Sequence, residues 1–180
     1  MKGRVRIASE GVNVVLDGEK QLVQLYQDAV SEDGRWGQIQ FKVGGLNPFK
    51  SVDEQRFARL SVKSSAEVVS IGLSPKEFPH TMGATHLSPS QWHAKLRELE
   101  AGGSSDECVL IDTRNVYESR IGRFRCRGAQ TMAPPLRQFT DFPKFVDEHV
   151  GELRGKTLLM YCTGGVRCER ASAYVIKKLQ

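Results

Sequence analysis

The sequence lacks any long apolar run. Among its 180 residues, no uninterrupted apolar stretch approaches the roughly 18 residues that a membrane-spanning helix needs. The first residues, Met1 to Arg6, alternate charged with small or apolar side chains and contain no apolar core of a secretory signal peptide. We therefore expect no membrane partner and no secretion by that route.

The sequence also lacks the cysteine and histidine spacings that are typical of zinc sites. The cysteines are Cys108, Cys126, Cys162 and Cys168, without a Cys-x-x-Cys pair, and the four histidines form no His-Glu-x-x-His pattern. Zinc sites use such closely spaced ligands, so we predict no metal site and no cofactor. Four cysteines without a signal peptide do not imply a disulfide framework. We interpret them as thiols in a reducing, cytoplasmic compartment, where one or more can do chemistry.

The composition is that of a globular protein. Apolar residues make up 39% and charged residues 26%, and no internal repeat or low-complexity segment is visible. This balance argues against wholesale disorder, collagen and coiled coil, and the length suits one medium domain or two small ones.

Residues 1–72 have the pattern of a partial α+β domain. Apolar residues alternate with polar ones from Val5 to Leu16, helical spacing follows from Glu19 to Ser31, and alternation returns from Ile39 to Val43. A longer strand is predicted from Phe57 to Ile71. The order strand, helix, strand, strand predicts part of a ferredoxin-like (acylphosphatase-like) sandwich, one strand and one helix short of the full unit.

Residues 73–88 are rich in Gly, Pro, Ser and His and show little periodicity, so we predict a linker there. At its end, Ser88-Pro89-Ser90-Gln91 has the residues of a capped helix start. Three apolar residues of that helix are predicted to face a core: Trp92, Leu96 and Leu99.

Residues 89–180 alternate apolar strands with helices. The strands are Cys108–Ile111 and Thr157–Tyr161, and helical stretches are predicted over 141–150 and 167–179. Strands that are apolar throughout are typical of a sheet buried on both faces. We therefore predict an α/β domain with a parallel sheet and crossover connections.

The segment after the second strand carries the clearest chemical signal. Cys162 is followed there by Thr163, Gly164, Gly165, Val166 and Arg167. The strand delivers Cys162 to the carboxyl edge of the sheet, where open α/β folds bind ligands. The glycines let successive N–H groups form an anion nest, the next helix adds its positive end, and Arg167 adds a full charge. These effects favour the thiolate, so we predict that Cys162 is a nucleophile with a pKa below the usual value of about 8.5.

Other interpretations of these cysteines remain open at this point. Cys162 could be a buried structural residue beside an ordinary turn, since free cysteines are often simply buried. Cys168 is either a packing residue or a resolving thiol, and Cys108 and Cys126 are read as core and loop residues. A dual-specificity phosphatase also uses a Cys–Arg loop, but its loop has one residue more, and the shorter loop here fits around sulfur better than around phosphate.

Four arginines lie within eight residues: Arg120, Arg123, Arg125 and Arg127. In a chain of formal net charge +5, such a cluster can attract RNA or another anion by counterion release. The competing interpretation is a solvated loop with scattered ion pairs, because no duplex-binding motif accompanies the cluster.

Several motifs resemble one family. The run from Tyr161 to Ala173 closely resembles the active-site loop of the rhodanese-domain proteins related to bacterial tRNA uridine hydroxylase. The stretch Asp112-Thr113-Arg114-Asn115-x-Tyr117-Glu118 is similar to the segment after an early rhodanese strand. Upstream, two stretches are similar to that family's amino-terminal ferredoxin-like domain: Gly3-Arg4-x-Arg6-x-Ala8-x-Glu10-Gly11-x-Asn13 and Arg59-Leu60-x-Val62-Lys63. The resemblance covers nearly the whole chain.

The resemblance implies two chemistries at Cys162. In sulfur transfer, Cys162 takes sulfane sulfur from a donor such as thiosulfate, holds it as a persulfide and passes it on, while the loop amides and Arg167 stabilise the anionic intermediate. In the hydroxylase relatives, the equivalent cysteine supports oxygen-dependent conversion of a wobble uridine in tRNA to 5-hydroxyuridine. The ferredoxin-like domain and the arginine cluster favour an RNA substrate, with the four arginines as candidate RNA-binding residues. Asp112, Arg114 and Cys168 are candidate supporting residues of the site.

The family pattern extends beyond both ends of this match. It begins with a further strand and helix before the equivalent of Gly3, and it continues after the active-site helix with another strand, a further helix and a Cys-rich tail. We therefore expect a chain truncated at both ends relative to the family, with a rhodanese-like domain that lacks its C-terminal part. The alternative function is a non-catalytic rhodanese-like interaction module or an inactive fragment.

Overall fold

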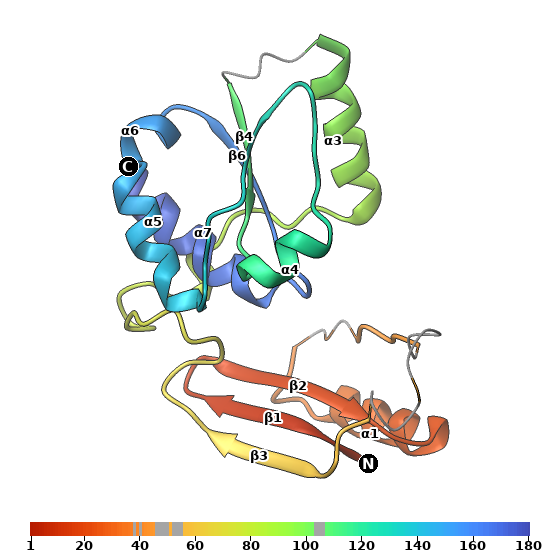
Figure 1. The fold of residues 1–180 in the computed structure, drawn as a ribbon. Coiled ribbons are helices and arrows are strands. Elements are labelled where there is room, and N and C mark those ends of the chain that lie inside the picture. The colour runs from red at the N-terminus through yellow and green to blue at the C-terminus, as the bar shows by residue number, and fades with distance from the viewer. Residues whose placement is uncertain (38, 40, 46–50, 52–55, 103–106) are drawn as a thin grey trace. The chain divides into compact units, whose positions relative to one another are not determined.

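The computed structural model describes residues 1–37, 39, 41–45, 51, 56–102 and 107–180. The chain divides into two compact units, Met1–Val68 and Val69–Gln180 (Figure 1). Within the described residues each unit contains one three-stranded sheet, with the strand order β2-β1-β3 in the first unit and β5-β4-β6 in the second.

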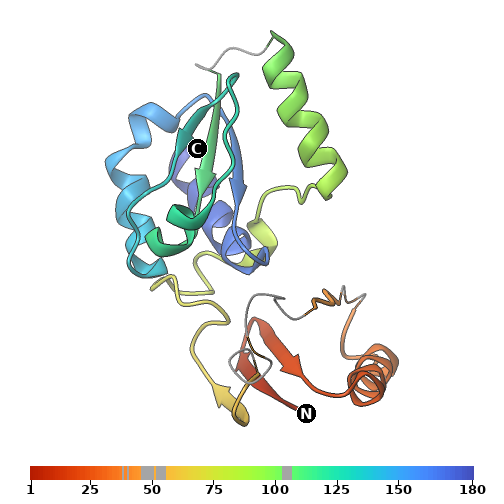
Figure 2. The same ribbon diagram turned by 45° about the vertical axis from the view of Figure 1, so that its right-hand side comes forward.

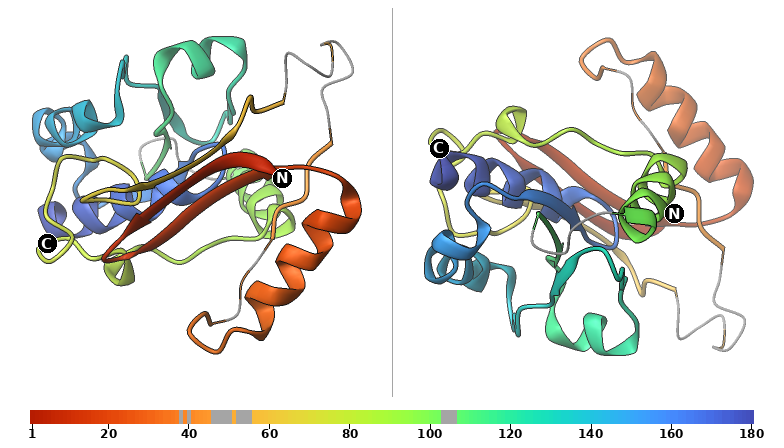
Figure 3. Two further views of the ribbon diagram at one scale, coloured as in Figure 1. Left: turned by 90° about the horizontal axis from the view of Figure 1, so that it is seen from below. Right: turned by 90° about the horizontal axis from the view of Figure 1, so that it is seen from above.

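The first unit opens with a β-hairpin. β1 (Lys2–Ala8) pairs antiparallel with β2 (Gly11–Asp17), and β3 (Leu60–Ser64) pairs parallel with β1. α1 (Lys20–Glu32) follows β2 and contains no fully buried residue. In both views of Figure 3, α1 projects away from the hairpin and does not lie across it. A small mixed sheet with a helix confirms the α+β prediction for this part of the chain.

Three details of the first unit differ from the expectation. The alternation from Val5 to Leu16 forms two strands, because the chain turns at Ser9 and Glu10. The described residues 39 and 41–43 lie in no strand, and residues 38 and 40 fall outside the described part of the chain. The strand predicted from Phe57 to Ile71 is limited to β3, and Ile71, only 1% exposed, belongs to the core of the second unit.

The second unit is a parallel sheet between two layers of helices, which confirms the α/β prediction. β4 (Cys108–Asp112) lies between β5 (Gln130–Met132) and β6 (Thr157–Tyr161) and runs parallel to both. Figure 2 shows α3 (Pro89–Gly102) on one side of the sheet and α5 (Phe142–Glu148), α6 (Val150–Leu153) and α7 (Val166–Leu179) on the other. The shorter elements are α4 (Val116–Ile121), η1 (His80–Met82) and η2 (Phe139–Asp141).

Every residue of β4 is buried, and the two helix layers explain why. Val109 and Ile111 pack in the cluster that includes residues of α5 and α7, whereas Cys108 and Leu110 pack with Leu99 of α3. Successive side chains of a strand point to opposite faces. A strand covered on both faces is therefore apolar along its whole length, as the run Cys108–Ile111 predicted.

α3 begins as predicted. The backbone N–H of Ser88 donates to Oε1 of Gln91 at 2.8 Å, and the N–H of Gln91 donates to Oγ of Ser88 at 3.3 Å. These reciprocal bonds satisfy donors at the helix start that have no intrahelical partner. The side chains of Trp92, Leu96 and Leu99 lie in the core cluster on this face of the sheet, as expected.

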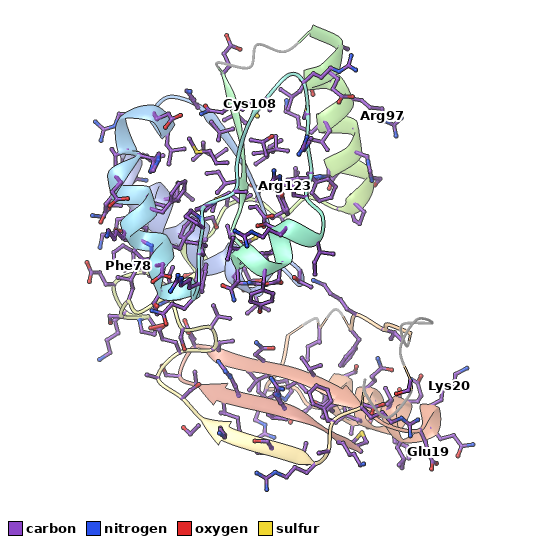
Figure 4. The ribbon with its side chains drawn as sticks, in the orientation of Figure 1. Glu19, Lys20, Phe78, Arg97, Cys108 and Arg123 are labelled. Atoms are coloured by element: carbon purple, nitrogen blue, oxygen red, sulfur yellow. The ribbon has the colours of Figure 1, made fainter. Side chains whose placement is uncertain are left out.

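Residues 73–88, predicted as a linker, pack against α7. Phe78, labelled in Figure 4, is 5% exposed and its ring contacts that of Tyr174 with centroids 5.2 Å apart. The buried guanidinium of Arg170 donates to the carbonyl oxygens of Leu73 and Phe78. An irregular segment carries carbonyl groups that need donors when they are buried. Arg170 supplies them, so this segment is an integral part of the second unit.

Candidate active site

The loop between β6 and α7 holds Cys162 at the carboxyl edge of the parallel sheet. Its Sγ accepts the backbone N–H of Gly165 at 2.9 Å, and the side chain is half-buried. Gly165 has a φ of 88°, in the left-handed region that glycine adopts without strain. This turn aims the N–H groups of the loop at the sulfur, as the Gly-Gly pair predicted.

The surroundings of Cys162 favour its thiolate. A hydrogen bond with the thiol of Cys168 lowers the pKa of Cys162 most, and the backbone N–H groups of Cys168, Gly164 and Gly165 lower it further. Burial opposes them, and together these effects bring the pKa of Cys162 to about 5. The thiolate is the reactive form of cysteine, so this site can present a nucleophile at neutral pH.

Arg167 has Glu118 as its main partner. Its Nη1 donates to Oε2 of Glu118 at 2.7 Å and its Nη2 to Oε1 at 2.8 Å, and Nη2 also donates to Oγ1 of Thr163 at 3.3 Å. The expected full positive charge beside the sulfur is therefore largely neutralised by a carboxylate. The Cys168 thiol and the loop N–H groups contribute more to the lowered pKa of Cys162.

Glu118 is a site residue that we did not single out from the sequence. Besides Arg167, its carboxylate accepts the hydroxyl of Thr163 at 2.7 Å and the N–H of Asn115 at 3.2 Å. The hydrogen bonds from Arg167 lower the pKa of Glu118 to about 2, so the carboxylate is ionised at neutral pH. The signal was present, because Glu118 is the last residue of the stretch that begins at Asp112.

Asp112 and Arg114 form an ion pair near the Cys162 loop. Asp112 is fully buried, and its carboxylate accepts Nε of Arg114 at 2.9 Å and Nη2 at 2.7 Å. The guanidinium also donates to the carbonyl oxygen of Gly122 at 2.6 Å and lies over the ring of Tyr161, 5.4 Å from its centroid. These contacts tie the segment after α4 to the residue before Cys162. Asp112 and Arg114 therefore hold these two segments together.

The other cysteines fall into two groups. Cys108 and Cys126 are 1% and 7% exposed and belong to the core cluster that includes Leu99 of α3. The Sγ of Cys168, in the first turn of α7, lies 3.7 Å from Oγ1 of Thr113, the residue after β4. The hydroxyl of Thr113 donates in turn to the carbonyl oxygen of Tyr161 at 3.0 Å. The hydrogen bond with Cys162 raises the pKa of Cys168.

Three members of the arginine cluster, Arg123, Arg125 and Arg127, lie on the extended segment between α4 and β5, which runs beside α3 in Figure 1, and Arg120 lies in the last turn of α4. Arg120, Arg123, Arg125 and Arg127 are all exposed, and none of them forms an ion pair with another described residue. Between them, Phe124 packs edge-on against Tyr161 with centroids 4.9 Å apart, and Cys126 is buried.

A hollow of about 490 Å³ lies along the arginine-bearing segment, and the residues around it include two of the four arginines. Its lining is Arg123, Arg125, Cys126, Thr131 and Ala133, and Figure 4 labels Arg123 there. Cys162 is not among the lining residues, so the hollow is separate from the thiol loop.

The described residues offer neither a cluster of metal ligands nor a membrane-spanning helix. No three His, Cys, Asp or Glu side chains within the described ranges gather as the ligands of a metal ion would. In the same part of the chain, no helix has both the length and the apolar character needed to cross a membrane.

Comparisons with known proteins agree with both units. Residues 1–68 match the family described as UPF0176 acylphosphatase like domain. The chain is 35% identical to Rhodanese-like domain-containing protein 6 of Arabidopsis thaliana, an alignment that covers 98% of this chain and 31% of that protein. It is 31% identical to the tRNA uridine(34) hydroxylase of Listeria welshimeri, with 97% of this chain and 50% of that protein covered. The hydroxylase of Staphylococcus saprophyticus is 32% identical, over 99% of this chain and 51% of that protein.

The chain is similar over nearly its whole length to a rhodanese-like domain protein and to these hydroxylases. This similarity confirms the resemblance seen in the sequence, and the two sheets fit an acylphosphatase-like domain followed by a rhodanese-like domain. The chain spans about a third of the Arabidopsis relative and about half of the two hydroxylases. No solved structure matches the chain.

Proposed function

We propose that Cys162 is the nucleophile of a rhodanese-type sulfur transfer. The observation that carries the proposal is the sulfur of Cys162 held by the N–H of Gly165 at 2.9 Å in a loop that favours the thiolate. A thiolate ringed by N–H donors can attack an electrophilic sulfur and then stabilise the negative charge of the product.

Thiosulfate illustrates the step. The thiolate of Cys162 attacks the outer sulfur of thiosulfate, the sulfur–sulfur bond of the donor breaks, and sulfite leaves with the electron pair. The outer sulfur of the resulting persulfide carries the negative charge. The N–H of Gly165, which already donates to Sγ of Cys162, is available to that sulfur, and Arg167 with Glu118 holds the loop to α4. A nucleophilic acceptor then removes the outer sulfur and restores the thiolate.

Intact-protein mass spectrometry tests the proposal directly. After incubation with thiosulfate and removal of excess donor, the protein is expected to gain the mass of one sulfur atom. Cys162→Ser is expected not to gain it, whereas Cys126→Ala, a change at a buried core cysteine, is expected to behave as wild type. Failure of the wild-type chain to take up sulfur would favour the non-catalytic interaction module.

A second candidate function is action on a uridine of tRNA. It is supported by the names of the hydroxylase relatives and by the exposed arginines on the segment between α4 and β5. Nucleoside mass spectrometry of tRNA from cells with and without the protein tests this candidate. A modified uridine that disappears with the protein supports it, and unchanged tRNA contradicts it.

Both candidate functions require reduced cysteine. All four cysteines are free thiols in the structure. A reducing compartment maintains thiols in that state. We therefore place the protein in the cytoplasm as part of the same proposal.

A further inference from the structure

The hollow of about 490 Å³ along the arginine-bearing segment lies on the α3 face of the sheet. Thr131 of β5 lines it and pairs in register with Leu110 of β4, which packs in the cluster that contains Leu99 of α3. Register partners on neighbouring strands point to the same face of a sheet, so the side chain of Thr131 points to the α3 face as well. Cys126, another lining residue, belongs to the same cluster. The hollow is therefore lined from β5 on one side and from the arginine-bearing segment on the other.

Two cations border this hollow without a counter-charge. Arg123 and Arg125 both line it, both are exposed, and neither forms an ion pair with another residue in the described ranges. Arg114 and Arg167, which hold segments of the same unit together, each donate to a carboxylate at 2.7 Å. No residue that lines the hollow is acidic. The two guanidinium groups are therefore available to an anion from solution.

The hydroxyl of Thr131 adds a neutral donor to the two cations. Its oxygen has no hydrogen-bond partner among the described residues, and it is not one of the oxygens that are sealed from solvent. Thr131 itself is half-buried, so its hydroxyl is held by the strand and not by a mobile surface side chain. The remaining lining groups are small: the thiol of Cys126 and the methyl group of Ala133. The hollow thus combines three hydrogen-bonding side chains with a small, weakly polar wall.

We propose that this hollow binds the phosphate group of a nucleotide, held by Arg123, Arg125 and Thr131. A guanidinium presents its N–H donors in a plane that matches the oxygens of a phosphate. The volume also suits more than a phosphate alone, because sites for small organic molecules measure about 300–1,000 Å³. The site contains neither Cys162 nor its loop, so the inference goes beyond sulfur transfer. Where the nucleotide belongs to an RNA strand, the inference rests on the second candidate function, whereas a free nucleotide does not require it.

The proposal divides the arginine cluster into two pairs of equal charge. Arg120 and Arg127 are exposed like the other two arginines, but neither of them lines the hollow. A phosphate attracted only by the summed charge of the cluster would involve all four arginines alike, because such attraction does not depend on a particular geometry. A phosphate bound in the hollow involves Arg123 and Arg125 in preference. The two pairs can therefore be compared directly.

Chemical protection of the wild-type chain tests the inference. Phenylglyoxal modifies exposed arginines, and a bound phosphate shields the arginines that hold it. Chymotrypsin cleaves after Phe124, so the modifications of Arg123 and Arg125 are read in separate peptides by mass spectrometry. We expect uridine monophosphate, a hexauridylate RNA or both to protect these two arginines more strongly than Arg120 and Arg127. Protection by the monophosphate supports a site for free nucleotides, and protection by the RNA alone supports a site for one phosphate of an RNA strand.

Calorimetric titration of variants with the protecting ligand gives a second measurement. The double variant Arg123→Ala, Arg125→Ala is expected to bind more than about tenfold more weakly, and Thr131→Val, which keeps the charge and shape, about threefold more weakly. The matched double variant Arg120→Ala, Arg127→Ala is expected to bind the monophosphate like wild type. Equal weakening by the two double variants, or no preferential protection by either ligand, would overturn the inference. Sulfur uptake and tRNA nucleosides are measured separately, so that result would leave both candidate functions to their own tests.

Discussion

The carboxylate of Glu118 and the guanidinium of Arg167 meet in a two-bond ion pair, with N–O distances of 2.7 and 2.8 Å. Both side chains are 19% exposed, so the pair is largely shielded from water. It joins α4 to the first turn of α7 and holds Thr163 between them. The loop around Cys162 is therefore fixed by a contact from outside the loop, which is a way to keep N–H groups preorganised for an anion.

Disruption of this pair is expected to destabilise the second unit in a pH-dependent way. Glu118→Gln should lower the free energy of unfolding by about 2 kcal/mol near pH 7, as for other charged hydrogen bonds of this type. The pKa of Glu118 is lowered from 4.5 to about 2 in the folded protein. Its stabilisation is therefore complete above the unfolded value near 4.5 and disappears as the pH falls towards 2.

Denaturant unfolding of wild type and Glu118→Gln at pH 7 and at pH 3 checks this expectation. The difference between the two proteins should be smaller at pH 3. Glu148→Gln, at an exposed i,i+4 pair with Lys144, serves as the matched control and is expected to change stability little at either pH. An equal difference at both pH values for Glu118→Gln would show that its carboxylate charge does not stabilise the fold.

Turnover of thiosulfate with cyanide should depend on Cys162. Production of thiocyanate is expected from the wild-type chain and is expected to vanish in Cys162→Ser, because a hydroxyl at this position cannot hold the sulfane sulfur. Colorimetric detection of thiocyanate measures the effect, and Cys126→Ala should retain activity. Thiocyanate production that survives in Cys162→Ser would move the nucleophile to another thiol.

Alkylation should select Cys162 in mildly acidic solution. Iodoacetamide at pH 6.5 is expected to label Cys162 first, since its pKa is about 5 and most of it is thiolate there. Cys108 is 1% exposed and its pKa is raised by burial, and Cys126 is 7% exposed, so both should react slowly. The rate at Cys162 should fall as the pH drops through 5. Peptide mass spectrometry measures the labelling, and equal labelling of all four thiols would contradict an activated site.

Neutralising part of the arginine cluster should separate RNA binding from thiol chemistry. The double variant Arg123→Ala, Arg125→Ala is expected to weaken binding to tRNA of any sequence. The slope of log affinity against log salt concentration should become shallower by about one unit per lost phosphate contact. Thiosulfate turnover should stay near wild type, because neither arginine lines the loop around Cys162. Binding titrations at several salt concentrations measure both quantities.

The control for this experiment removes two exposed basic residues elsewhere in the second unit. Lys144→Ala with Arg154→Ala changes the net charge equally at α5 and just after α6. If this control weakens binding as much as the arginine variant, the effect is one of net charge alone. If the arginine variant binds tRNA with unchanged affinity and salt slope, the cluster is a solvated segment without a role in RNA binding.

The sequence by itself determined the elements that depend on neighbouring residues. The apolar runs of β4 and β6, the capped start of α3 and the Gly-Gly turn after Cys162 follow from local periodicity and backbone freedom, so they could be predicted. The turn between β1 and β2 was not predicted, although Gly11 follows Ser9 and Glu10 there and has a φ of 141°. The segment 73–88 was read as a linker, since the donors from Arg170 that hold it come from nearly a hundred residues away.

Only the tertiary structure decided how the site is assembled. Glu118 meets Arg167 across 49 residues of sequence, and Thr113 meets Cys168 across 55. These contacts exist because β4 and β6 are adjacent and parallel, which brings the segments after their carboxyl ends together. Strand order depends on how whole layers pack, and a local pattern of residues does not contain it. The sequence therefore identified the nucleophile candidate, while the fold supplied its carboxylate brace and its neighbouring thiol.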